Sequence, residues 1–168
     1  IINSVTSEIE AIKETRENAR YKSLVDEATA KVNDAQKEFD DKKQEVENEL
    51  QDAENQIKNA ENQIASSERK IQNGEKELNT QIEQANAQFA SAKAQLENAE
   101  KQLEVAPLED TVKEAQKAEL LKQKQALETS QKEAEAKFEQ AKTEIANNKA
   151  EIRKAKSKLS SSKKLKTN

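Results

Sequence analysis

The chain has 168 residues, of which 37% are charged, only 33% are hydrophobic and 2% are aromatic, and its net charge is −4. A globular domain usually has about 45–50% apolar residues, so this composition argues against a closed globular core and for extended helices. Cysteine and histidine are absent, which removes disulfides, thiolate metal sites and the commonest general base. We therefore expect that the chain is not an enzyme and has no cofactor. The net charge of −4 gives no reason to expect a nucleic acid partner. Because the chain starts with Ile1-Ile2 and has no signal peptide, we interpret it as a piece of a larger protein.

Residues 1–56 are predicted to form the first part of a long helix. The helix-start signals are Asn3, or Ser7 with Glu10, and the helix is expected to continue for about 95 residues, straight or with one kink. Apolar residues recur along the region at Val5, Ile9, Ile12, Val25, Ala28, Val32, Ala35, Phe39 and Val46. Nothing later in the chain is left to pair with it. We expect residues 1–50 to self-associate, to bind another protein, or to stay exposed and be stabilised by Glu–Lys pairs.

Residues 57–105 carry a heptad repeat, which indicates the first arm of a coiled coil. Large residues lie seven apart with small residues between them, and one step of four separates Leu78 from Ile82 where three was due. Such a stutter locally unwinds a supercoil. The repeat is made of Ile57, Ala60, Ile64, Ser67, Ile71, Gly74, Leu78, Ile82, Ala85, Phe89, Ala92, Leu96, Ala99 and Leu103.

Pro107 is the only proline, and it is predicted to mark the tip of a hairpin. Proline lacks an N–H donor and disfavours helix at the residue before it, so the first helix should stop at Ala106. A second helix should then start with a capping box formed by Thr111 and Glu114, or with Asp110 alone as the cap.

The return arm repeats the pattern of the first arm, including one stutter between Ala134 and Phe138. Folding the chain at the proline aligns both stutters and places seven apolar residues of each arm opposite one another: Ile57 with Leu159, Ile64 with Ile152, Ile71 with Ile145, Leu78 with Phe138, Ile82 with Ala134, Phe89 with Leu127 and Leu96 with Leu120. The predicted fold class is therefore all-α, an antiparallel two-helix coiled-coil hairpin with unequal arms. The same alignment places the basic residues between Arg153 and Lys166 along the acidic stretch from Glu47 to Glu54.

Five segments follow from these patterns. They are an N-terminal helical extension that is unpaired within the chain or bound to a partner (1–56), the first arm (57–105), the turn (106–110), the return arm (111–160) and a basic flexible tail (161–168).

No residue is assigned a catalytic, cofactor-binding or metal-binding role. Carboxylate pairs such as Asp41 with Glu45, or Glu45 with Glu49, share a helix face. Acid–base catalysis or metal binding, however, needs oxygens that converge in a concave site, which a two-helix rod does not offer. These acidic residues are therefore interpreted as a solvated face.

Three other features have two interpretations each. Gly74 is interpreted as a packing position that lets the helix approach Ala141, with a hinge as the alternative. Asn148 opposite Ser67 either fixes the register as a buried polar residue or is simply tolerated. Tyr21 is either a partner anchor or an ordinary surface residue.

The basic end, from Arg153 to Lys166, also has two interpretations. It either contacts anionic lipid headgroups or cell-wall polymers, or it is a solvated terminus matched to the opposing acidic stretch.

The stretch "EIEAIKETRENARYKSLVDEATAKVNDAQKEFDDKKQEVENELQDAENQI" begins at Glu8. It contains Ala19-Arg20-Tyr21 and Val25-Asp26-Glu27-Ala28, and the repeats "DAENQIKNAENQI" and "SAKAQLENAEKQL" follow. In these features the chain resembles the extracellular coiled-coil insertion of FtsX-like (MacB-type) ABC transporter permeases of Gram-positive bacteria. Residues 8–35 carry the specific part of the resemblance, since the later repeats match many coiled coils.

The resemblance implies an integral membrane parent that works with a cytoplasmic ATPase subunit. The chain would then stand on the extracellular face of the cell membrane, between the parent's transmembrane helices, without catalytic residues of its own. It would act as a rigid lever or binding post that couples transmembrane motion to an extracellular protein or peptide. Two alternatives are a surface-exposed coiled-coil adhesin or host-binding region, and the helical hairpin of a membrane-fusion adaptor.

Overall fold

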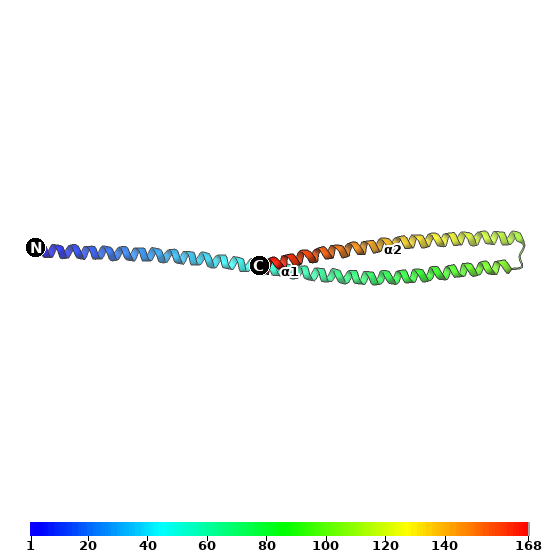
Figure 1. Ribbon diagram of the computed structural model, residues 1–168, viewed down its shortest axis with the longest axis horizontal. Helices are drawn as coiled ribbons and strands as arrows, with labels where there is room; N and C mark the ends of the chain where they lie inside the picture. The colour runs from blue at the N-terminus through cyan, green and yellow to red at the C-terminus, as the bar shows by residue number, and fades with distance from the viewer. Residues whose placement is uncertain (168) are drawn as a thin grey trace. The chain divides into compact units, whose positions relative to one another are not determined.

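The computed structural model describes residues 1–167, and these residues form two α-helices (Figure 1). Helix α1 is Ile2–Val105 and helix α2 is Asp110–Thr167, and the described residues contain no strand. The chain divides into two compact units, which we call the N-terminal unit (Ile1–Gln56) and the hairpin unit (Ile57–Asn168). The predicted all-α fold class, with two helices packed against each other, is confirmed.

The N-terminal unit is helical from Ile2 onward, so both predicted start signals were placed too late. The first turn is closed by a hydrogen bond from the Val5 amide to the Ile1 carbonyl at 3.2 Å, without a side-chain cap. A cap stabilises a helix end but does not impose one where strong helix formers continue the pattern. As a result α1 has 104 residues rather than about 95.

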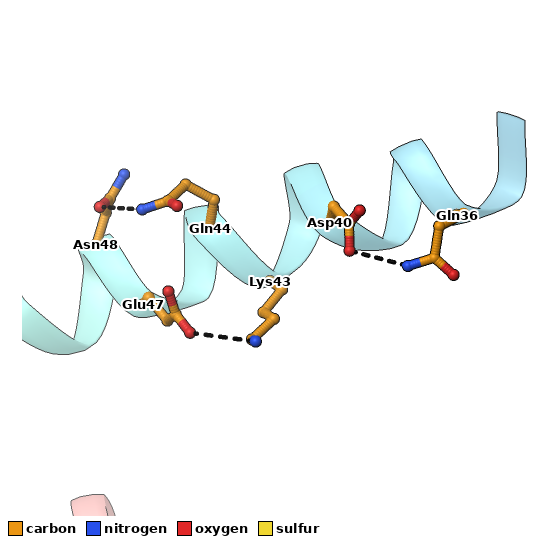
Figure 2. A network of polar contacts seen from close by, with 6 residues as sticks. All are labelled: Gln36, Asp40, Lys43, Gln44, Glu47 and Asn48. Carbon is orange, nitrogen blue, oxygen red and sulfur yellow. Dashed lines mark hydrogen bonds and ion pairs between the residues drawn. The ribbon is translucent and has the colours of Figure 1, made fainter. Parts of the chain in front are cut away.

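Along the N-terminal unit, polar side chains contact one another one helical turn apart. Figure 2 shows Gln36 donating to Asp40 at 3.0 Å, Gln44 donating to Asn48 at 3.2 Å and Lys43 paired with Glu47 at 3.8 Å. Pairs with this spacing each stabilise an isolated helix by about 0.2–0.5 kcal/mol. They support the helix without covering its apolar residues.

In the hairpin unit, α2 returns along α1 with the opposite polarity (Figure 1). Four ion pairs between the helices establish the direction, because the α2 number falls as the α1 number rises. They join Glu61 to Lys163, Glu68 to Lys156, Glu75 to Lys149 and Glu100 to Lys124. The hairpin is therefore antiparallel, as predicted.

The turn spans residues 106–109, between the end of α1 and the start of α2. The Leu108 amide donates to the Ala106 carbonyl at 2.9 Å, and the amides of Val112 and Lys113 both donate to the Glu109 carbonyl at 3.0 Å. The turn is thus closed by the backbone on both sides of the proline.

The carbonyl of Glu109 accepts the first backbone hydrogen bonds of helix α2. The predicted capping box was wrong, because Thr111 already lies inside the helix. Asp110 is the first helical residue rather than the cap, and its carboxylate still lies at the positive end of the helix dipole.

The seam between the helices follows the predicted heptad positions. The large seam residues of α1 from Ile57 to Leu96 and those of α2 from Leu120 to Leu159 are half-buried, as are Ala60, Ala85, Ala92 and Ala99. Leu103, beside the turn, is the one buried residue among those described, with 6% of its surface exposed. A single seam between two helices leaves one side of every contact open, so this fold has no closed interior.

Three polar seam positions do not follow the prediction, since Ser67, Asn148 and Ser162 are exposed. Asn148 therefore does not fix the register as a buried polar residue. Next to them, Glu68 and Lys149 are half-buried instead, because each forms an ion pair with the opposite helix.

The register also differs in detail from the predicted pairing of large residues. Ile64 lines one groove together with both Ile152 and Leu159, so it lies between two large residues of α2. Ile71 likewise shares a groove with Ile152. Knobs-into-holes packing explains this, because a large side chain of one helix enters a gap between large side chains of the other. Two further large residues show a neighbour one heptad beyond the predicted one: Leu78 with Ile145, and Leu96 with Leu127.

Gly74 does not serve close helix packing. A Cβ placed on it would meet nothing within 4 Å, and its φ is negative. The packing interpretation was wrong, because the antiparallel seam leaves open space beside this small position.

Helix α2 extends to Thr167, beyond residue 160, where the return arm was predicted to end. Ser161 and Ser162 donate their hydroxyls to the carbonyls of Ser157 and Lys158 at 3.1 and 3.0 Å. Lys164 and Lys166 lie in the last turn, where positive charge favours the helix dipole. These contacts explain why the helix continues through the basic end.

Candidate functional site

One edge of the hairpin is a line of opposite charges, which we call the charged edge. It consists of the four interhelical ion pairs, with every glutamate on α1 and every lysine on α2. From Glu61 to Glu75 the glutamates of these pairs lie seven residues apart. The fourth pair, Glu100–Lys124 at 2.5 Å, lies closer to the turn. In an antiparallel coiled coil, the positions that flank the seam on one helix face the equivalent positions on the other. The glutamates of α1 therefore meet lysines when the partner is α2, and would meet glutamates if the partner were a second α1.

The charged edge contributes more to specificity than to stability. The side chains of its members remain 34–52% exposed, and ion pairs with such exposure contribute about 0–1 kcal/mol each. Pairing α1 with another α1 would instead place glutamate against glutamate, and pairing two α2 helices would place lysine against lysine. The edge therefore favours pairing of an α1 helix with an α2 helix over pairing of like helices.

The grooves beside the seam do not form a reaction site. The groove at Ile71 and Ile152 is lined by Glu68, Glu75 and Lys149 among others, and none of its lining residues is buried. Four of its charged residues form two interhelical pairs, Glu75 with Lys149 and Glu68 with Lys156. Water-accessible, paired charges of this kind lack the dry, convergent geometry that catalysis requires.

The carboxylates considered from the sequence lie in the N-terminal unit. Asp41, Glu45 and Glu49 are exposed, and Glu45 pairs with Lys42 at 3.4 Å. Within residues 1–167 no three Asp, Glu, His or Cys side chains are placed to hold a metal ion.

Tyr21 and the basic end occupy different units. Tyr21 is 71% exposed on the N-terminal unit. At the basic end, Lys156 and Lys163 pair with Glu68 and Glu61 of the hairpin. For Lys156 the predicted alignment with Glu47–Glu54 was wrong. Contact of this end with lipid headgroups or wall polymers stays a prediction.

The N-terminal unit presents an exposed row of apolar residues that we call the N-terminal stripe. It consists of Val25, Val32, Phe39 and Val46, spaced seven apart, with Ala28 and Ala35 three residues after the first two. Seven residues complete nearly two helical turns, so these side chains share one face. They are 44–66% exposed, whereas seam residues of the same type in the hairpin are half-buried. A row of exposed large apolar residues indicates a binding surface.

The hairpin tip is a second apolar surface, and sequence analysis did not assign it. Val105, Leu108 and Val112 surround the proline, and Val105 is 83% exposed. The available signal was three branched apolar residues in and beside a turn, where polar residues are the rule. We call these three residues the apolar tip.

Comparison with known proteins finds no matching family model, no significantly similar curated protein and no significantly similar solved structure. The resemblance to permease insertions therefore stays a prediction. In the described residues, neither helix has a stretch long and apolar enough to cross a membrane.

Proposed function

We propose that this chain is a non-enzymatic coiled-coil module whose hairpin works as a rigid lever or binding post. In this proposal it belongs to an FtsX-like ABC transporter permease and stands on the extracellular face of the cell membrane. It couples movement of the parent's transmembrane helices, driven by a cytoplasmic ATPase subunit, to an extracellular protein or peptide. The sequence resemblance of residues 8–35 supports the class of parent.

The observation that carries the mechanical part is the pair of stutters, one in each arm. A lever must transmit displacement without its two helices sliding past each other. Sliding by one heptad in one direction would still place lysines opposite the glutamates of the charged edge, since Glu61 would meet Lys156 and Glu100 would meet Lys117. It would, however, separate the stutter at Leu78–Ile82 from the one at Ala134–Phe138, and so misalign the seam. One antiparallel register is therefore favoured over its neighbours.

The apolar tip is the proposed contact for the extracellular partner. Val105, Leu108 and Val112 are exposed, and contact of their apolar surface with water is unfavourable. Each Å² of this surface that a partner covers would contribute about 25 cal/mol to the binding free energy. A surface adhesin of the long parallel type fits less well, because this chain folds back on itself. An adaptor hairpin has arms of equal length, whereas α1 has 104 residues and α2 has 58.

The location is tested by labelling the parent protein in intact cells. The chain has no cysteine, so Glu109→Cys at the turn introduces a single thiol here. A membrane-impermeant maleimide should label this thiol without permeabilisation, and a cysteine in the ATPase subunit serves as the inaccessible control. Labelling only after permeabilisation would overturn the extracellular assignment.

The lever is tested by shortening the hairpin without changing its register. Deleting residues 64–70 together with 150–156 removes one ion pair, Glu68–Lys156, and keeps all other pairs aligned. This variant should retain its helix content and unfolding midpoint nearly unchanged while the ATP-dependent activity of the parent falls. Deleting 64–67 alone is the misregistered control, because removing four residues changes the heptad phase of the first arm, and it should lower the unfolding midpoint. Full activity with the paired deletion would exclude a lever of defined length.

A further inference from the structure

We propose that the N-terminal stripe docks antiparallel against the same stripe of a second copy of this chain. The inference concerns the N-terminal unit and goes beyond the lever proposal, on which it does not depend. Self-association was one of the outcomes expected for residues 1–50. The proposal gives it one orientation and one register, in which the two-fold axis of the dimer lies close to Asn33 and Asp34.

The first support is the order of large and small residues along the stripe. In the hairpin, Ile64 lies between two large residues of the other helix, Ile152 and Leu159, beside the small residue Ala155. The stripe has the same alternation, with valine or phenylalanine followed three residues later by alanine. In one antiparallel register, Val32 of each copy lies beside Ala35 of the other copy. The same register places Phe39 of each copy beside Ala28 of the other. This two-fold arrangement is self-complementary, as an isologous interface requires.

The second support is the charge beside these apolar layers. In the same register Lys31 of each copy faces Glu38 of the other, at flanking positions that meet in an antiparallel pair. Lys31 is now paired only along its own helix, with Glu27 at 3.1 Å, and both side chains are more than 60% exposed. Exposed pairs along one helix stabilise it only weakly, so exchanging the partner costs little.

The third support is the uneven distribution of charge along the unit. Residues 13–22 contain four basic and two acidic residues, whereas residues 34–54 contain nine acidic and three basic residues. Antiparallel docking places the basic stretch of each copy along the acidic stretch of the other. Parallel docking would place the acidic stretch against itself. Charge therefore selects the antiparallel orientation.

The main experiment is sedimentation equilibrium of the full chain over a concentration series up to about 0.2 mM at low salt. Phe39→Asp places a charge in the stripe and should weaken the dimer by at least about tenfold. Ala30→Asp is the matched control, because residue 30 is exposed and lies on the opposite face of the same helix. It should change the dissociation constant by less than about twofold. A full chain that stays monomeric throughout, or a dimer that Phe39→Asp leaves intact, overturns the proposal.

The orientation is tested by exchanging charges. Lys31→Glu and Glu38→Lys should each weaken the dimer, because each creates like-charge contacts, and the double variant should restore it. Absence of rescue overturns the proposed register.

Spin labels give a second readout of orientation. Labels on a cysteine at position 33 should lie close together across the dimer, whereas labels at position 18 should lie about 45 Å apart. Short distances at both positions mean a parallel dimer and overturn the antiparallel docking.

Discussion

The N-terminal unit and the hairpin unit have the same heptad pattern but differ in what covers it. Phe39 is 62% exposed in the N-terminal unit, whereas Phe89 and Phe138 are half-buried in the hairpin seam. All three lie on helices with apolar residues seven apart. The difference arises because residues 57–105 have a return arm with matched spacing and opposite charge, which the N-terminal unit lacks in this chain.

This comparison shows that a heptad pattern specifies a face and not a partner. The helix itself needs only local hydrogen bonds and helix-forming residues, so it forms in both units. The gain from apolar burial appears only where a second helix is present. The hairpin finds that helix within the chain, and the N-terminal stripe leaves the contact open.

The largest expected difference between the units comes from removing a phenylalanine. Phe138→Ala should lower the free energy of unfolding of the hairpin by about 2 kcal/mol, because it removes a half-buried ring from the seam. Phe39→Ala is the matched change and should cost less than about 0.5 kcal/mol in dilute protein, because that ring is already exposed. Urea unfolding followed by circular dichroism measures both. Equal losses would show that the N-terminal stripe is covered in the monomer.

A smaller effect is expected from breaking the charged edge. Glu68→Lys places a positive charge against Lys156 and should lower the free energy of unfolding by about 1 kcal/mol at low salt. Adding Lys156→Glu should restore most of the loss, and salt at about 1 M should shrink both effects. The corresponding change on the N-terminal unit, Glu47→Lys, breaks only a local pair with Lys43 and should have less effect. If the Glu68→Lys variant is as stable as the wild type, the charged edge does not help to determine the register of the hairpin.

Gly74→Ala should raise stability. The added methyl group meets nothing within 4 Å, and alanine is more favourable than glycine in a helix by about 0.8–1.0 kcal/mol. Thermal unfolding measures the increase. A lower midpoint would show that the glycine is needed for close approach or bending, which the structure does not indicate.

The smallest effect is expected at Asn148. This residue is exposed, so Asn148→Ala should change the free energy of unfolding by less than about 0.7 kcal/mol, the difference in helix propensity alone. A cysteine-crosslinking map of the two arms should be the same as in the wild type. A changed map would restore Asn148 as a register-fixing residue.

The elements that sequence analysis predicted well depend on local or periodic information. Pro107 marked the turn because proline excludes helix at the preceding residue, and the seven-residue spacing from Ile57 to Leu103 marked the seam. Errors occurred where the outcome depends on how side chains share space across the seam. Ile71 was paired with Ile145 alone, Gly74 was assigned to close packing, and Thr111 was predicted as a helix cap two residues too late.

The candidate surfaces show the same division. The sequence already indicated both the apolar residues of the N-terminal stripe and the lack of a later segment to pair with them, and the structure shows these residues exposed. The apolar tip was missed because exposure at a turn depends on which side chains the two helix ends leave uncovered.

The sequence by itself determined the helices, the site of reversal and the face that each arm turns to the other, because these follow from backbone propensity and from the period of apolar residues. Only the tertiary structure decided which large residue enters which gap, which lysine meets which glutamate, and which apolar residues stay in water. Those outcomes depend on the relative translation and rotation of two helices by a fraction of a turn, and a repeating sequence contains several almost equivalent solutions for both.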